Sequence, residues 1–109
     1  MRALKNIRRK KMIAQGGLCY YCAQPMWDTV TASPMPVAHN SARMAEHLRC
    51  TAEHLVPRSE GGVDSADNIV AACWLCNNSR HWRKKPPSPE AHRAHVRKRI
   101  AAGAWPGAH

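Results

Sequence analysis

Two Cys-x-x-Cys pairs limit what this chain can fold into more than any other feature of the sequence. Cys19 and Cys22 form the first pair, Cys73 and Cys76 form the second, and residues 23–72 lie between them. Each pair can bend its backbone so that both thiolates reach one ion, and two pairs complete the tetrahedral four-sulfur shell that structural zinc prefers. Because the gap is longer than in a compact zinc finger, a whole subdomain must lie between the pairs. We therefore expect these four Cys to bind one structural Zn²⁺.

The apolar composition explains why such a chain needs a metal. Among 109 residues there are five Leu, four Ile, six Val and no Phe, 15 residues in all. That share is below the roughly 20% under which a charged chain is expected to be disordered. Structural zinc contributes on the order of 10–16 kcal/mol of binding free energy, which so thin a core cannot supply. Redox dithiols and buried free thiols are the alternatives, but two matching pairs favour zinc. Cys50 is left over and is expected to be a small buried residue.

The charge of the chain is strongly positive and unevenly distributed. Seventeen Lys and Arg stand against seven Asp and Glu, which gives a formal net charge of +10. Basic residues concentrate in residues 1–15 and 80–99, whereas five of the seven acids lie within residues 46–67. This pattern favours a polyanionic partner, nucleic acid first and an anionic membrane surface second, with two solvated basic helices as the alternative. No apolar run approaches the roughly 18 residues of a transmembrane helix, and no secretory signal is present, so we expect a cytoplasmic protein.

Apolar spacing and helix breakers predict a small α+β domain. A helix is expected over residues 3–15, and Gly16-Gly17 is expected to end it. A last helix is expected to begin at Ser88-Pro89-Glu90, a sequence typical of a helix start, and to run to Gly103. The other expected elements are a long loop over 23–48 with a short helix near 42–48, a strand over 51–56, a loop over 58–67, a strand over 68–72 and a helix over 74–84. We expect one domain over residues 1–109, with a basic N-terminal helix in 1–18, a zinc-stapled core in 19–85, and a basic C-terminal helix and tail in 86–109.

The segment around the second Cys pair resembles the HNH endonucleases. In order, it contains Glu53-His54, Pro57, Gly61-Gly62, Asn68 before a short strand, and the pair Cys73–Cys76 followed by Asn77. A second Glu-His dipeptide, Glu46-His47, lacks these landmarks. The resemblance implies a ββα-metal fold, in which a helix packs across two antiparallel strands. The expected fold class is therefore α+β, a small ββα-metal HNH core stapled by the four-cysteine zinc site and flanked by basic N- and C-terminal helices.

The resemblance also implies an activity. HNH endonucleases are metal-dependent hydrolases of DNA phosphodiester bonds that nick one strand or cut both and leave a 3′-hydroxyl and a 5′-phosphate. His54 matches the general base, Glu53 and Asn77 match ligands of the catalytic divalent cation, and Asn68 matches the residue that holds the loop and orients the base. His81 lies one helical turn after Asn77 and is a further candidate ligand. Oxygen ligands favour Mg²⁺ or Mn²⁺, whereas ligation by His81 would favour Zn²⁺, Ni²⁺ or Co²⁺.

DNA is the expected partner, and several basic residues are candidates to contact it. Arg80 is expected to bind a phosphate, and the other candidate DNA-binding residues are Arg83, Lys84, Arg8, Arg9, Lys10 and Lys11. A zinc-stapled DNA-binding module without catalysis, or an adaptor of a larger DNA-processing complex, is the alternative function. Glu53, His54, Asn68 and Asn77 separate the two hypotheses, because a binding module has no need to arrange them.

Aromatic and imidazole side chains outside these motifs are assigned to the core and the surface. The four Trp are expected to fill the core of a chain without Phe, with stacking on a base or a sugar as the alternative for Trp82. Surface positions are expected for the remaining imidazoles, His39, His47, His92, His95 and His109. The C-terminal helix is expected to be exposed and to approach DNA, with docking on the fold as the alternative.

Overall fold

The chain forms a small α+β structure in a computed structural model that describes residues 2–28 and 42–106. Its elements are α1 (Arg2–Ala14), α2 (Ala42–His47), β1 (Cys50–His54), a 3₁₀ helix η1 (Arg58–Glu60), β2 (Ile69–Cys73), α3 (Trp74–Arg80) and α4 (Pro89–Ala101). The predicted α+β fold class is confirmed. Half of the loop expected over 23–48, residues 29–41, lies outside the described residues, as do His39 and His109. None of the helices in the described ranges is long and apolar enough to cross a membrane.

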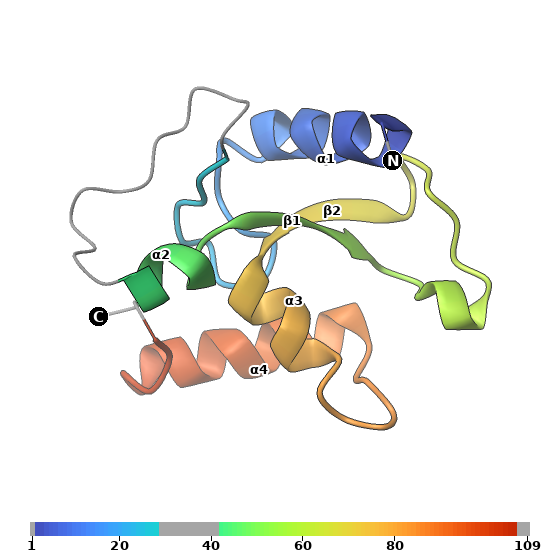
Figure 1. The fold of residues 1–109 in the computed structure, drawn as a ribbon. Helices are drawn as coiled ribbons and strands as arrows, with labels where there is room; N and C mark the ends of the chain where they lie inside the picture. Colours follow the sequence, from blue (N-terminus) through green and yellow to red (C-terminus); the bar gives the residue numbers. More distant parts are fainter. Residues whose placement is uncertain (1, 29–41, 107–109) are drawn as a thin grey trace.

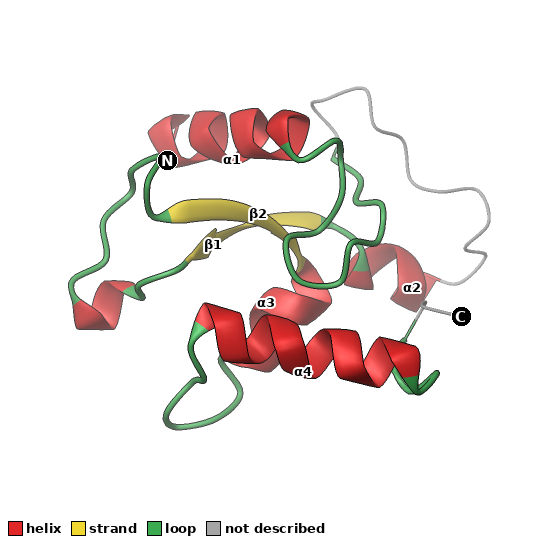
Figure 2. Ribbon diagram, turned by 180° about the vertical axis from the view of Figure 1, so that it is seen from behind, coloured by secondary structure: helices red, strands yellow, loops and turns green. Residues whose placement is uncertain are grey.

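The two strands form one antiparallel sheet with helices on both faces. Cys50 pairs with Cys73 at one end of the ladder, and His54 pairs with Ile69 at the other. Figure 1 shows α1 along one face of the sheet and α3 and α4 on the opposite face, and Figure 2 shows the same layers from behind. All five residues of β2 are buried. A strand covered on both faces has this continuous apolar sequence.

The outer edge of β2 is paired by the residues that follow α1. The side chain of Gln15 donates from Nε2 to the Ala71 carbonyl at 2.8 Å and accepts the Ala71 N–H at Oε1 at 2.9 Å. The backbone N–H of Tyr20 donates to the same carbonyl at 3.0 Å, and the N–H of Cys73 donates to Cys19 Sγ at 3.3 Å. An open strand edge leaves backbone groups unpaired, so these bonds replace a third strand. They also join the first Cys pair to the sheet.

Helix boundaries follow the predicted signals except at the end of α3. Gly16 and Gly17 adopt positive φ angles of 67° and 79° directly after α1. Ser88 accepts a hydrogen bond from the N–H of Ala91 at 3.1 Å and so caps α4. The helix predicted to reach residue 84 ends at Arg80 instead. There the Arg80 Nε donates to the Pro87 carbonyl at 2.9 Å, which holds the chain as it turns back.

The core is small and contains sulfur at its centre. Its buried members are Met12, Cys19, Tyr21, Cys22, Met26, Leu48, Cys50, Ala71, Ala72, Cys73, Leu75, Cys76, Val96 and Trp105. Trp27 and Trp74 pack against this core, as predicted, but Trp82 is 69% exposed and the core prediction is wrong for it. The surface prediction is wrong for His92, which is buried in α4 and lies 3.1 Å from the Cys76 carbonyl.

The loop between the strands is held by Asn68. Its Oδ1 accepts the N–H of Val56 at 2.8 Å, and its Nδ2 donates to the carbonyls of Val56 at 3.0 Å and Val63 at 3.1 Å. Gly62 lies so close to this network that a Cβ atom would stand 1.7 Å from the Val56 oxygen and 2.9 Å from Asn68 Nδ2. The double Gly of the sequence therefore allows the loop to fold onto Asn68.

This close approach predicts that Gly62→Ala destabilises the protein. The Val56 backbone would have to move, and forced repacking of this kind costs about 1–3 kcal/mol or more. Urea unfolding of the zinc-loaded protein measures the loss. Ala66→Ser, an exposed change in the same loop, is the control and should leave the midpoint unchanged. Equal stability of Gly62→Ala and the wild type would contradict this loop geometry.

Candidate metal centre and active site

The four Cys of the two pairs come together in one buried cluster. One Sγ from each of Cys19, Cys22, Cys73 and Cys76 lies within 4.8 Å of every other. In a tetrahedral Zn²⁺ site, bonds of about 2.3 Å would set the sulfurs about 3.8 Å apart. The sulfurs of Cys22 and Cys73 lie 3.9 Å apart. The donor set and its spacing thus fit the predicted zinc site.

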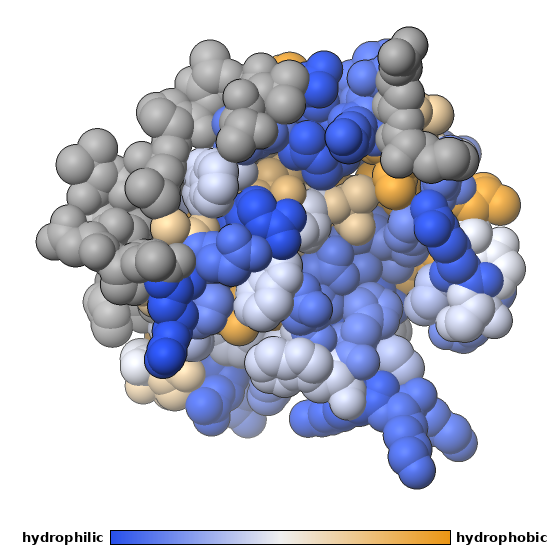
Figure 3. Space-filling model, in the orientation of Figure 1, coloured by the Kyte–Doolittle hydropathy of each residue, from blue (hydrophilic) through white to orange (hydrophobic). Residues whose placement is uncertain are grey.

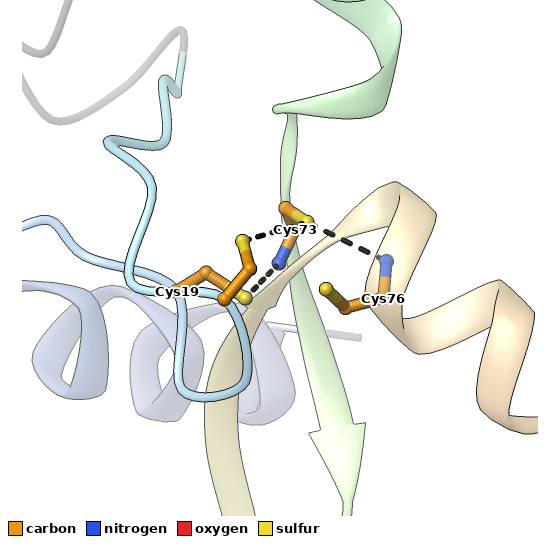
Figure 4. A group of neighbouring side chains, drawn as sticks. Cys19, Cys73 and Cys76 are labelled. Atoms are coloured by element: carbon orange, nitrogen blue, oxygen red, sulfur yellow. Dashed lines mark hydrogen bonds between the residues drawn. The ribbon is translucent and has the colours of Figure 1, made fainter. Parts of the chain in front are cut away.

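Backbone N–H groups already point at these sulfurs. Cys19 Sγ accepts from the N–H of Tyr21 at 3.4 Å and from that of Cys73 at 3.3 Å, and Cys73 Sγ accepts from the N–H of Cys76 at 3.4 Å. Figure 4 shows Cys19, in the loop after α1, facing Cys73 and Cys76 at the junction of β2 and α3. Hydrogen bonds to a thiolate favour its charged form, which is the form that binds metal. The loop, β2 and α3 are therefore joined at one point.

Cys50 lies in the core apart from this cluster, as predicted. It is 5% exposed at the start of β1. Burial raises the pKa of its thiol, although the nearby Arg8 guanidinium acts in the opposite direction. Cys50 is therefore held as a neutral thiol, which is a poor metal ligand.

These observations predict that Cys76→Ser removes the bound zinc and unfolds the chain, whereas Cys50→Ser does neither. A structural zinc site contributes folding free energy directly, and the remaining core is too small to replace it. Elemental analysis should find about one zinc per chain in the wild type and in Cys50→Ser, and circular dichroism should show lost structure in Cys76→Ser. A Cys76→Ser protein that stays folded without zinc would contradict the assignment.

Glu53 is the most enclosed charged residue among those described, at 1% exposed. Its Oε2 accepts from the Tyr21 hydroxyl at 3.0 Å and from Arg80 Nη1 at 3.1 Å. Its other oxygen, Oε1, lies 3.1 Å from His81 Nε2. Burial and then the charge of Glu53 raise the pKa of Tyr21, so the phenol stays protonated and donates. One carboxylate oxygen is thus fixed by the protein, and the other faces an imidazole.

Arg80 holds α3 against the end of β1. Its guanidinium donates to Glu53, to the His54 carbonyl at 3.1 Å and to the Leu55 carbonyl at 3.1 Å. The side chain is only 3% exposed. This placement differs from the exposed phosphate contact predicted for Arg80. A buried carboxylate without a counter-charge would be costly, and Arg80 supplies that charge.

Asn77 and His81 stand one turn apart at the end of α3. Asn77 Nδ2 donates to Thr51 Oγ1 at 3.0 Å and to the Ala52 carbonyl at 3.2 Å, so it ties α3 to β1. Within the described ranges, no hydrogen bond joins Asn77 to Glu53. His81, whose side chain is 33% exposed, makes the direct contact with the carboxylate. Of the three predicted cation ligands, Glu53 and His81 therefore meet, and Asn77 lies beside them.

His54 has an acidic partner that the sequence analysis did not single out. Its Nε2 lies 2.7 Å from Asp64 Oδ1, and Arg58 Nη2 contacts the same carboxylate at 2.9 Å. The hydrogen bond from His54, followed by that from Arg58, holds the pKa of Asp64 below its usual range. Asp64 is therefore ionised at neutral pH, and it accepts a hydrogen bond from the Nε2–H group of His54. The only signal in the sequence was the clustering of acids in residues 46–67.

The other predicted DNA-binding residues differ in how far they are exposed. Arg83, Lys84 and Lys10 are exposed, and Arg9 and Lys11 are half-buried. Arg8 instead forms an ion pair with Asp28 at 2.6 Å, in which the two side chains are 13% and 6% exposed. Figure 3 shows strongly hydrophilic side chains over much of the described surface on the face seen in Figure 1. Exposed cations therefore remain at both basic segments, although Arg8 is not one of them.

Comparison with known proteins agrees with this geometry. Residues 39–83 match the family model described as HNH endonuclease. The match contains β1, the loop, β2 and α3, together with Cys73 and Cys76, and it confirms the resemblance over that segment. The first Cys pair lies outside it. No curated protein matches the chain.

Proposed function

We propose that this protein is a metal-dependent endonuclease that hydrolyses DNA phosphodiester bonds at the end of β1. The observation that carries the proposal is the placement of two acid–imidazole pairs on adjacent strand residues. Glu53 lies 3.1 Å from His81 of α3, and His54 lies 2.7 Å from Asp64 of the loop. Successive strand residues point to opposite faces, so each can serve a different part of the reaction. A protein that only binds DNA has no use for both pairs.

His54 acts as the general base in this proposal, and Asp64 sets its tautomer. Because the Nε2–H group of His54 donates a hydrogen bond to ionised Asp64, the lone pair of the neutral imidazole is on Nδ1. Nδ1 takes a proton from the attacking water. Asn68 keeps the loop that carries Asp64 in place through its bonds to Val56 and Val63. Asp64 and Asn68 are thus positioning residues, and His54 is the catalytic residue.

Glu53 Oε1, His81 Nε2 and the amide oxygen of Asn77 are the proposed ligands of the catalytic cation. When bound, the cation neutralises charge that develops on the phosphate and on the departing oxygen. Tyr21 and Arg80 keep Glu53 Oε2 fixed at 3.0 and 3.1 Å, which aims Oε1 at His81. An imidazole in the donor set widens the range of ions from Mg²⁺ or Mn²⁺ to Ni²⁺, Co²⁺ or Zn²⁺.

The reaction is a hydrolysis in which one bond forms at phosphorus and one breaks. The water oxygen bonds to phosphorus as its proton passes to His54 Nδ1. The bond from phosphorus to the 3′ oxygen breaks, and that oxygen takes up a proton from solvent. The products are a 3′-hydroxyl and a 5′-phosphate. Arg83, Lys84 and Lys10 are exposed cations that can hold the flanking DNA phosphates.

The proposed base predicts the outcome of His54→Ala. Plasmid nicking by this variant should fall by about 10²–10⁴-fold, because loss of a general base removes activation of the water. Zinc content and DNA affinity should stay at wild-type values. Asp64→Asn should also be slower, because the group that fixes the tautomer of His54 is weakened.

The matched control is His47→Ala, which changes the other Glu-His dipeptide and should cleave as wild type. Nicking is measured on zinc-loaded proteins with Mg²⁺, Mn²⁺, Ni²⁺ or Co²⁺ added in turn. Normal cleavage by His54→Ala with every ion would contradict the proposal that this site is the active site of an endonuclease. A wild type that binds DNA but cleaves with none of these ions would favour the DNA-binding module.

The proposed ligands predict a second, weaker metal site. Binding is measured by calorimetric titration of zinc-loaded protein with Mn²⁺ or Ni²⁺. Glu53→Gln should no longer bind either ion at this site, because the carboxylate that faces His81 is replaced by a neutral amide. His81→Ala should weaken Ni²⁺ more than Mn²⁺, since imidazole favours the softer ion. Tyr21→Phe should weaken both ions by a smaller factor because Oε2 loses one donor. Glu60→Gln, an exposed change in η1, is the control. Unchanged titrations of Glu53→Gln would rule out this cation site.

A further inference from the structure

A groove of about 580 Å³ lies between α4 and the end of α3. Its lining includes Trp82, Arg83, His95, Arg99 and Trp105, and no acidic side chain is among the described residues that line it. The volume is within the roughly 300–1,000 Å³ typical of ligand sites. Figure 2 shows α4 in front of α3, together with the loop that connects the two helices. The groove therefore combines aromatic surface with positive charge.

Trp82 supplies an open indole at this groove. It is 69% exposed, whereas Trp105 in the same groove is 9% exposed and fills the core. A large aromatic side chain left in water contributes little to folding, and an indole offers a face on which a base can stack. Trp82 also lies between His81 and Arg83 in the chain. The indole is therefore one residue from the proposed cation ligand and one residue from an exposed cation.

Arg83 and Arg99 supply the positive charge at the groove. Both are exposed and come from different segments, the connection that follows α3 and the last turn of α4. His92, at the groove wall, is fixed by its contact with the Cys76 carbonyl at 3.1 Å. The fixed positive charge of the groove comes from the two guanidinium groups. Guanidinium groups beside an aromatic face suit a ligand that has both a phosphate and a planar ring.

We propose that this groove binds an unpaired nucleotide of the DNA strand next to the scissile phosphate, with its base on Trp82 and its phosphates on Arg83 and Arg99. A base inside a duplex is already stacked on both faces and cannot present one to Trp82. The groove would therefore direct the enzyme to single-stranded, gapped or branched DNA. This inference rests on the proposed endonuclease function for its substrate, but its binding step needs no cleavage.

The test compares one short oligonucleotide as a single strand and as a duplex. Fluorescence anisotropy with zinc-loaded protein, and with no second divalent cation added, should show tighter binding of the single strand by the wild type. Trp82→Ala should weaken single-strand binding by about 5- to 100-fold, while Trp82→Phe should recover part of it, because stacking on one base is lost or reduced. The salt dependence should be unchanged in Trp82→Ala. In Arg99→Ala the slope of log K against log salt should become shallower by about 0.7.

Lys98→Ala is the matched control, since it removes an exposed cation of α4 that does not line the groove. It should leave the single-strand preference intact. Single-strand binding by Trp82→Ala as tight as that of the wild type would overturn the proposal. Displacement of the oligonucleotide by poly-glutamate at equal charge would also overturn the proposal, because it would show that the groove binds any polyanion. Binding that depends on Trp82 in a protein that never cleaves would support the groove and reject the endonuclease.

Discussion

The meeting of four buried Cys in one cluster that can bind a metal ion is the constraint on which the rest of this structure depends. Cys19 and Cys22 come from the loop after α1, and Cys73 and Cys76 come from the junction of β2 and α3. The buried core around them consists largely of Ala, Cys and Met side chains, with few large aliphatic ones. Four buried thiols in contact would contribute little to the free energy of folding by themselves, whereas four thiolates bound to Zn²⁺ would contribute to it directly. A Zn²⁺ ion bound by these four Cys would thus take the place of the apolar core that the chain lacks.

The same cluster reaches the candidate active site through one side chain. Tyr21 lies between the first two Cys, and its hydroxyl donates to Glu53 Oε2 at 3.0 Å. On the other side, Arg80 follows the second pair on α3 and donates to the same oxygen at 3.1 Å. Both groups that fix the carboxylate therefore come from elements that the thiolates hold. Order in the zinc site is a condition for order at Glu53, even though the two sites have different chemistry.

Features set by neighbours in the chain could be predicted from the sequence, and features set by distant partners could not. The Cys pairs, the Gly-Gly end of α1, the Ser88 cap and the run Ile69–Cys73 are local patterns, and the structure places them as predicted within a few residues. Arg8 and Arg80 look like any exposed cation in the sequence. Their burial depends on Asp28 and Glu53, and only the folded chain brings those partners near. The pairing of His54 with Asp64 was missed for the same reason.

The zinc K-edge absorption spectrum of the purified protein tests the central claim most directly. The chain contains seven His as well as five Cys, so mixed nitrogen and sulfur sites are chemically available. If the four Cys bind the zinc, the spectrum will show one shell of four sulfur atoms at about 2.3 Å, with no nitrogen or oxygen bound directly to the zinc. A shell that contains nitrogen or oxygen at about 2.0–2.1 Å, or fewer than four sulfurs, would contradict this assignment.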